Sequence, residues 1–213
     1  VEMLAETLAA DQIDSVTGIL NGTTNAMLHA MSRGTSYADA LAKAQREGLA
    51  ESDPSADVEG HDAAAKLAIL IMLAFRRRID AASISRSGIS DLDPARLRSA
   101  RESGQVVKLV AAAVDQDYRI AADVRPRLVP AGDPLAQVDG PDNGILIDAS
   151  YAGALFLKGP GAGPEAAASA VLADLIRAAR DLPASAGRLL ASLADTPPAV
   201  LVPLARDEPY GAA

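Results

Sequence analysis

The sequence contains no cysteine and no tryptophan, and aromatic residues make up only 3% of its 213 residues. Without cysteine there is no thiol nucleophile, no disulfide and no thiolate metal ligand. The few aromatic rings leave few surfaces on which nucleic-acid bases could stack. The hydrophobic core therefore has to be built from Ala, Leu, Val and Ile.

Positive charge is also scarce, because 20 Lys and Arg stand against 28 Asp and Glu, for a net charge of -8 and a pI near 4.7. A nucleic-acid partner would require a basic face. The longest apolar run, residues 67–75, is far shorter than the roughly 20 residues that span a bilayer. No charged-then-apolar leader opens the chain. We therefore expect a cytoplasmic protein with neither a nucleic-acid nor a membrane partner.

Hydrophobic residues make up 49% of the chain, enough for one sizeable core, and no repeat or clear linker divides it. We therefore predict a single domain over residues 1–213. Helical spacing and caps predict helices, and a period of two predicts strands. The predicted helices span 3–10, 26–34, 37–47, 61–75, 94–104 and 164–181; the predicted strands span 13–20, 106–114, 118–129, 143–150 and 152–159, with a last one within 199–205. This segregation favours an α+β fold with helices on one face of a sheet.

The chain begins in an unusual way, because residues 1–12 have the pattern of the middle or end of a helix and no cap precedes them. We expect that a preceding part of a larger fold is missing.

Five carboxylates stand within twelve residues, directly before and at the start of the apolar helix predicted for 61–75. They belong to Glu51, Asp53, Asp57, Glu59 and Asp62. Lys66 lies inside that helix, four residues after Asp62, so the two side chains share a face. A capping Asp with a surface ion pair is one interpretation. The other is a lysine held between an apolar helix and carboxylates, which is typical of a tuned acid or a substrate contact. The pattern alone leaves both open, and since hard cations need no amine beside their carboxylates we predict no metal site.

Two glycine-containing segments could also border a ligand. GPGAGP, residues 159–164, ends a strand and opens a helix, where glycines let the backbone approach an anion. It is not the G-x-G-x-x-G dinucleotide fingerprint, and a plain turn explains it equally well. NGTTN, residues 21–25, is either a common turn or a pair of hydroxyls at a helix start. His29 and His61 fit no catalytic spacing, and we interpret both as structural.

Four regions carry a resemblance to a known family. They are GILNGTTNAML (18–28), AQREGLAESDPSADVEGHDAAAKLAIL (44–70), QVVKLVAAA (105–113), and RPRLVPAGDPLAQVDGPDNG (125–144) followed by AGALFLKGPGAG (152–163). Their order and spacing identify the chain as a member of the homoserine dehydrogenase family. The resemblance implies that family's substrate-binding and dimerisation domain, a mixed sheet with helices on one face.

The resemblance also implies roles for the acids and the lysine. Lys66 matches the catalytic lysine, the proton donor to the aldehyde oxygen of aspartate semialdehyde. Glu51 matches the glutamate that holds the substrate amino group. Asp57 and Asp62 match the aspartates around the substrate, and Asp62 is predicted to act with Lys66 in catalysis.

Glycines and a threonine complete the set that the resemblance implies. Thr23, with Gly22 before it, matches the threonine near the substrate. Gly161 and Gly163 match glycines that lie near the nicotinamide and the substrate, so they would contact a cofactor only if a nucleotide is supplied with a partner domain.

The sequence also departs from the family pattern. Leu49 replaces the usual tyrosine two residues before the substrate glutamate, and Pro164 to Ala167 replace the usual proline-threonine. The N-terminal Rossmann unit, the second active-site lysine, the alkali-metal loop and the ACT regulatory module have no counterpart here. We therefore expect that the chain alone binds no cofactor, and that NAD(P)H requires a separate nucleotide-binding domain.

Three functions remain open, all with a homodimer through the sheet as the expected assembly. The first is the substrate-binding half of a homoserine dehydrogenase in amino-acid biosynthesis, either a fragment or a chain paired with a separate Rossmann-domain chain. The second is a standalone, cofactor-free enzyme that uses Lys66 for elimination, cyclisation or aldehyde addition on a related amino acid. The third is a non-catalytic dimerisation or binding protein. Retention of the acids together with Lys66 argues against the third.

Overall fold

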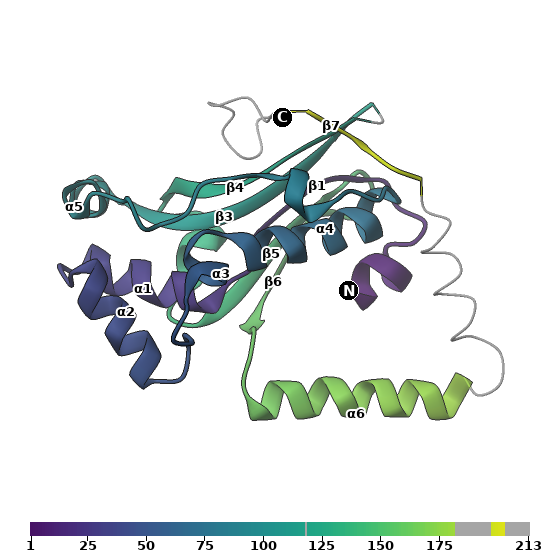
Figure 1. Cartoon of the computed structure of the whole chain (residues 1–213). Coiled ribbons are helices and arrows are strands. Elements are labelled where there is room, and N and C mark those ends of the chain that lie inside the picture. The colour runs from purple at the N-terminus through teal and green to yellow at the C-terminus, as the bar shows by residue number, and fades with distance from the viewer. Residues whose placement is uncertain (118, 182–196, 203–213) are drawn as a thin grey trace.

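The computed structural model describes residues 1–117, 119–181 and 197–202, and within these it shows one mixed sheet with helices beside it (Figure 1). The strands are β1 (Ile13–Ile19), β2 (Ser85–Arg86), β3 (Gln105–Gln116), β4 (Arg119–Pro130), β5 (Asp142–Ala149), β6 (Gly153–Pro160) and β7 (Val200–Val202). Their order in space is β2-β4-β3-β1-β5-β6, with β7 also paired to β4. The four long neighbouring pairs are antiparallel, whereas β2 and β7 pair with β4 in parallel.

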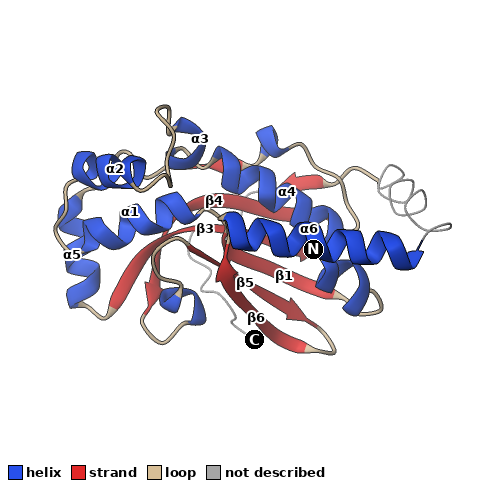
Figure 2. Cartoon of the chain, turned by 90° about the horizontal axis from the view of Figure 1, so that it is seen from below, coloured by secondary structure: helices blue, strands red, loops and turns tan. Residues whose placement is uncertain are grey.

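The helices are α1 (Gly22–Ser32), α2 (Tyr37–Arg46), α3 (Ser55–Val58), α4 (His61–Phe75), α5 (Pro94–Glu102) and α6 (Pro164–Asp181). Three shorter turns, η1 (Met3–Thr7), η2 (Ala81–Ser83) and η3 (Pro134–Gln137), complete the described secondary structure. Seen from below the sheet, α1 to α4 lie together over one of its faces (Figure 2). The predicted α+β class, with a mixed sheet and helices on one face, is confirmed.

The strand predictions and most helix predictions are confirmed with small changes of boundary, and three segments differ. The helix predicted for 3–10 is only the five-residue π-helical turn η1 (Met3–Thr7). The helix predicted for 26–34 already begins at Gly22, because the Asn21 side chain accepts a hydrogen bond from the Thr24 backbone N–H and caps the helix there. NGTTN is therefore a cap and first turn rather than a break. The acidic segment, predicted as a loop, contains the single turn α3. The part of the predicted 199–205 strand beyond residue 202 lies outside the described residues.

The helix predicted for 61–75 is α4, and it packs its apolar side chains against the sheet. Leu67 and Ile71 are completely buried in the main hydrophobic core. Opposite them, Ala111 and Ala113 of β3 and Ala122 of β4 leave room for the helix to approach the strands. This close approach places the N-terminal end of α4 beside the end of β1 and the start of α1.

The opposite face of the sheet carries a smaller apolar cluster. It contains Ile19, Val110, Val129, Leu135 and Val138, so that η3 and the residues after it cover part of this face. The helix α6 lies apart from the other helices in Figure 1. None of the helices within the described ranges is both long and apolar enough to cross a membrane.

Candidate active site

The candidate site lies where β1 ends and where α1, α3 and α4 come together. Asn21, the residue between β1 and α1, is 4% exposed and connects these elements. Its side-chain amide nitrogen donates to Asp57 Oδ1 at 2.6 Å and to Asp62 Oδ2 at 2.9 Å. Its amide oxygen accepts from the Thr24 backbone N–H at 2.9 Å. One amide therefore caps α1 and holds carboxylates from α3 and α4 near one another.

Lys66 joins the same group from the next turn of α4. Its Nζ lies 2.7 Å from Asp62 Oδ2 and donates to the Leu20 backbone carbonyl at 3.0 Å. The Lys66 side chain is 44% exposed and the Asp62 side chain 32% exposed, so the pair sits at a boundary with solvent. The predicted i,i+4 pair is present, and it also touches backbone from another element, which an ordinary surface pair does not require.

The two predicted residues of the α1 start form a wall of the site. The Thr23 hydroxyl donates to the Leu49 backbone carbonyl at 2.6 Å and so fixes the segment that leads to Glu51. A Cβ on Gly22 would lie 2.3 Å from the Pro141 carbonyl oxygen, so only glycine fits against that turn.

Glu51 is placed differently from the other acids. Its backbone carbonyl accepts from the Gln45 side chain at 3.1 Å, whereas its exposed carboxylate makes no hydrogen bond or ion pair with any described residue. The structure thus brings Asp57, Asp62 and Lys66 together and leaves the Glu51 carboxylate without a partner among the described residues.

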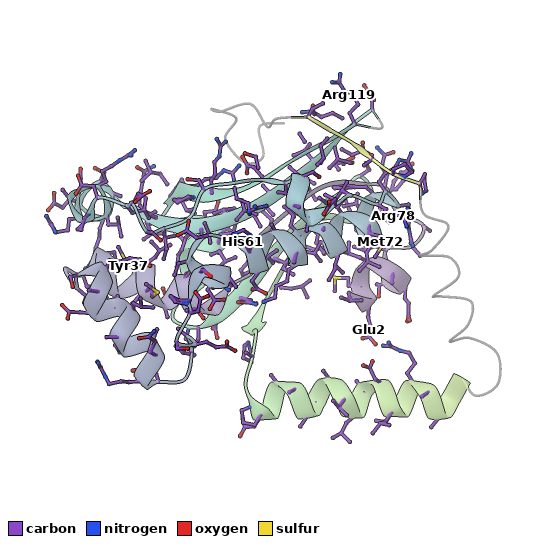
Figure 3. All side chains as sticks on the ribbon, viewed as in Figure 1. Glu2, Tyr37, His61, Met72, Arg78 and Arg119 are labelled. Atoms are coloured by element: carbon purple, nitrogen blue, oxygen red, sulfur yellow. The ribbon has the colours of Figure 1, made fainter. Side chains whose placement is uncertain are left out.

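Other acids and both histidines have local surroundings. Asp53 accepts from the Ser55 backbone N–H, which lowers the pKa of this exposed carboxyl. His29 Nδ1 lies 3.4 Å from Asp139, and the exposed His61 stands at the N-terminal end of α4 (Figure 3). Within the described ranges, no group of three or more His, Asp or Glu side chains is arranged to hold a metal ion.

The glycine turn that precedes α6 reaches the site through Asn143 of β5. A Cβ on Gly161 would lie 2.1 Å from the Asn143 amide nitrogen. That nitrogen donates to the Leu20 carbonyl at 3.3 Å, the same oxygen that Lys66 contacts. Gly163 has a φ of 116° and open space around it.

A buried lysine fixes the turn behind the site. Lys108 of β3 is 3% exposed, and its Nζ donates to Asn25 Oδ1 at 3.0 Å and to the Val138 carbonyl at 2.5 Å. Asn25 in turn donates to the carbonyls of Val138 and Gly140. These bonds hold residues 138–142 against α1, and hence against Gly22.

Sequence reasoning missed the connecting residues Asn21, Asn25, Lys108 and Asn143. The Asn immediately before a helix start was an available signal for Asn21, because Asn is a favoured N-cap. A lysine within the apolar run of residues 106–114 was the signal for Lys108. Nothing local marks Asn143, whose partners are far away in the sequence.

The sequence and the fold are both similar to those of known proteins. A family model described as homoserine dehydrogenase matches residues 1–176. The homoserine dehydrogenase of Corynebacterium glutamicum is 47% identical over 184 residues, which are 84% of this chain and 41% of that protein. The crystal structure of a homoserine dehydrogenase from Thiobacillus denitrificans has a TM-score of 0.85 at 38% identity and covers 95% of this chain and 48% of that one.

A third relative carries a cofactor. A hyperthermophilic archaeal homoserine dehydrogenase mutant in complex with NADPH has a TM-score of 0.71 at 32% identity, covering 85% of this chain and 52% of that one. The present chain thus spans about half the length of the relatives that it matches.

Because Lys108 is buried, the stability of the fold should depend on pH. Burial disfavours the ammonium and lowers the pKa of Lys108; nearby Asp139 opposes this and Lys158 adds to it. Between that lowered pKa and the value of about 10.4 expected for the unfolded chain, the unfolded state binds more protons. The contribution of Lys108 to the free energy of unfolding therefore rises with pH in this window.

We expect the difference in unfolding free energy between the unsubstituted chain and Lys108→Met to grow as the pH is raised towards about 10.4, the pKa of lysine in the unfolded chain, in urea titrations. Lys43→Met, at a lysine whose side chain is 58% exposed, serves as the control and should show no such trend. A difference that stays constant or shrinks with pH would contradict the assignment.

Proposed function

Because the chain belongs to the homoserine dehydrogenase family, we propose that it forms the substrate-binding and catalytic half of such an enzyme. In this proposal residues 1–213 make one domain that binds L-homoserine or aspartate semialdehyde. It contributes the side chains that bind the amino acid and the lysine that donates a proton to the substrate oxygen. The observation that carries the proposal is the cluster of Asp57, Asp62 and Lys66 around the Asn21 amide.

The charge of this cluster suits an amino acid. Asp57 and Asp62 carry two negative charges and Lys66, which pairs with Asp62, carries one positive charge, so one negative charge remains to be balanced. The exposed Glu51 lies on the segment that Thr23 holds through the Leu49 carbonyl. The ammonium group of a bound amino acid would supply the balancing charge. Charge-assisted hydrogen bonds of this kind are among the stronger ones in proteins, which supports recognition of a zwitterion rather than of a neutral aldehyde.

Lys66 is suited to deliver a proton to the substrate oxygen. An ammonium has three N–H donors. Asp62 and the Leu20 carbonyl take two of them. The third is available to the aldehyde oxygen, which would become the hydroxyl of homoserine once it takes this proton and the carbonyl carbon takes a hydride from NAD(P)H. Asp62 keeps the ammonium oriented and stabilises its charge before the transfer.

Homoserine dehydrogenases exchange a hydride with NAD(P), and the described residues do not fit a whole dinucleotide. A dinucleotide lies across parallel strands joined by crossover helices. Here the long neighbouring strands are antiparallel, and the parallel pairs involve only the short β2 and β7. We propose that Gly161 and Gly163 border the nicotinamide, while a separate nucleotide-binding domain holds the rest.

The first test is calorimetric titration of the chain with L-homoserine. We expect saturable binding. We expect Asp62→Asn to weaken it at least about tenfold, because the ammonium group of the bound amino acid loses a negatively charged acceptor. Asp53→Asn is the matched control in the same acidic segment and should bind as the unsubstituted chain does. No binding at millimolar concentrations, or equal losses in both variants, would contradict the proposal.

The role of Lys66 needs a turnover measurement. When the chain is combined with the nucleotide-binding half of a homoserine dehydrogenase, we expect Lys66→Ala to lower kcat by at least about 100-fold. Its circular dichroism spectrum should be unchanged, since the Lys66 side chain is half-exposed. A variant that retains its turnover would remove Lys66 from the mechanism.

The proposal also predicts how the isolated chain behaves towards the cofactor. We expect that NADPH does not saturate the isolated chain at micromolar concentrations, because the part of the chain that the structure describes has no long parallel strands joined by a crossover helix to hold it. Calorimetric saturation in that range would contradict this expectation.

Proton NMR of aspartate semialdehyde with the chain and no nicotinamide separates the proposal from cofactor-free chemistry. The proposal requires no conversion. Conversion that disappears in Lys66→Ala would favour the standalone enzyme instead.

We also propose a homodimer through the sheet face that points away from α1 to α4. Thr17 lies opposite Ala112 and Leu146, and Leu146 lies opposite Phe156, so these side chains form one row across four strands. The row is made of small and apolar residues, and the Phe156 side chain is 38% exposed.

Sedimentation should therefore report a dimer, and Leu146→Asp should convert it to a monomer, since a carboxylate would be buried at the centre of the contact. Tyr151→Asp, in the exposed turn between β5 and β6, should leave the dimer intact. A monomeric unsubstituted chain would rule this interface out.

A further inference from the structure

Asn143 and Lys66 both donate a hydrogen bond to the backbone carbonyl of Leu20. The Leu20 carbonyl oxygen accepts from Lys66 Nζ at 3.0 Å and from Asn143 Nδ2 at 3.3 Å. Leu20 immediately precedes Asn21, whose amide holds Asp57 and Asp62. The Asn143 amide therefore contacts the backbone carbonyl that holds the Lys66 ammonium in addition to Asp62.

The other end of the same amide has no partner. Asn143 Oδ1 is buried, and in the described part of the chain it is the one buried side-chain nitrogen or oxygen atom without a hydrogen bond. Burying an acceptor without a donor costs free energy, so proteins keep few such atoms. A leucine of similar size would avoid the cost. The hydrogen bond that the amide nitrogen donates to Leu20, rather than side-chain packing, therefore accounts for an asparagine at this position.

The surroundings leave the amide little freedom. The Gly161 backbone lies so close that a Cβ there would come within 2.1 Å of the amide nitrogen and 2.8 Å of the amide oxygen. On the other side, Lys108 and Asn25 hold the turn that leads into β5. The Asn143 side chain therefore lies between the glycine turn and the Leu20 carbonyl, and its amide nitrogen points at that carbonyl.

We propose that Asn143 is a positioning residue for Lys66, acting through the Leu20 carbonyl that both side chains contact. The second hydrogen bond fixes the direction of this carbonyl. The carbonyl and Asp62 together then define where the third N–H of the Lys66 ammonium points. The consequence for ligand binding rests on the proposed function, but the hydrogen bond itself does not.

The sequence offers a selective probe of this carbonyl. Only three asparagines occur, and Leu20–Asn21 is the only Leu-Asn pair among the 213 residues. A chain labelled with 1-¹³C-leucine and ¹⁵N-asparagine gives a single carbonyl–amide correlation, which reports the Leu20 carbonyl. Its ¹³C signal moves upfield when a hydrogen-bond donor is lost.

We expect that upfield shift in Asn143→Leu and in Asn143→Asp, since neither side chain donates once the aspartate is ionised. Asp142→Asn, a change at the preceding residue whose carboxylate lies 3.5 Å from Lys158, is the control and should leave the signal in place. An unchanged Leu20 signal in both Asn143 variants would overturn the proposal.

A stability measurement separates positioning from packing. Asn143→Leu removes the unpaired buried oxygen, so its melting temperature should equal or exceed that of the unsubstituted chain. If Asn143→Leu instead melts lower and leaves the Leu20 signal unmoved, Asn143 is a structural residue only.

The functional arm is a double-mutant cycle with Lys66. Asn143→Leu should weaken L-homoserine binding about fivefold, as expected for the loss of one neutral hydrogen bond, when Lys66 is present. It should cause no further loss in the Lys66→Met background. Equal losses in both backgrounds would show that Asn143 does not act through Lys66. If the unsubstituted chain binds no L-homoserine, the proposed function fails, while the carbonyl signal still decides the role of Asn143.

Discussion

The side-chain amide of Asn21 is the interaction on which the site depends. Two carboxylates from different helices lie within hydrogen-bond distance of one nitrogen, and without a donor between them they would repel one another. The same amide caps α1 through its oxygen, so the position of α1 and the spacing of the carboxylates are set by one group. A change that moves α1 would therefore change the charge distribution that a ligand meets.

The sheet supplies the rigid support for this amide. Lys108 lies near the start of β3 with its ammonium buried, and its hydrogen bonds run to α1 and to the turn before β5. A buried charge of this kind is costly, and an apolar side chain of similar size would often be at least as stable. Its donor satisfies the amide oxygen of Asn25 and adds a second hydrogen bond to the Val138 carbonyl, to which the Asn25 amide nitrogen also donates. The result is a fixed wall formed by Pro141 against Gly22.

Most of the fold could be predicted from the sequence, because its signals are local. The apolar run of α4, the Ser36 cap of α2 and the alternating strands each report on a few neighbouring residues. The pairing of Asp62 with Lys66 was predictable for the same reason, being one helical turn in length. The link from Asn143 to Leu20 spans 123 positions, so no local pattern could reveal it. The role of NGTTN was also ambiguous, because Asn-Gly suits a turn and a helix cap equally well.

The solvent exposure of the Lys66–Asp62 ion pair indicates what the pair contributes to the protein. A half-exposed lysine-aspartate pair adds little to folding stability, because water competes for both charges. Stability alone therefore does not explain why this pair also engages the Leu20 carbonyl and, through it, Asn143. The same charges interact far more strongly once water is excluded, since the Coulomb energy rises as the effective dielectric constant falls. The arrangement is thus one whose electrostatic effect grows when a ligand covers it, which is what a proton-transfer site requires and what a structural ion pair does not.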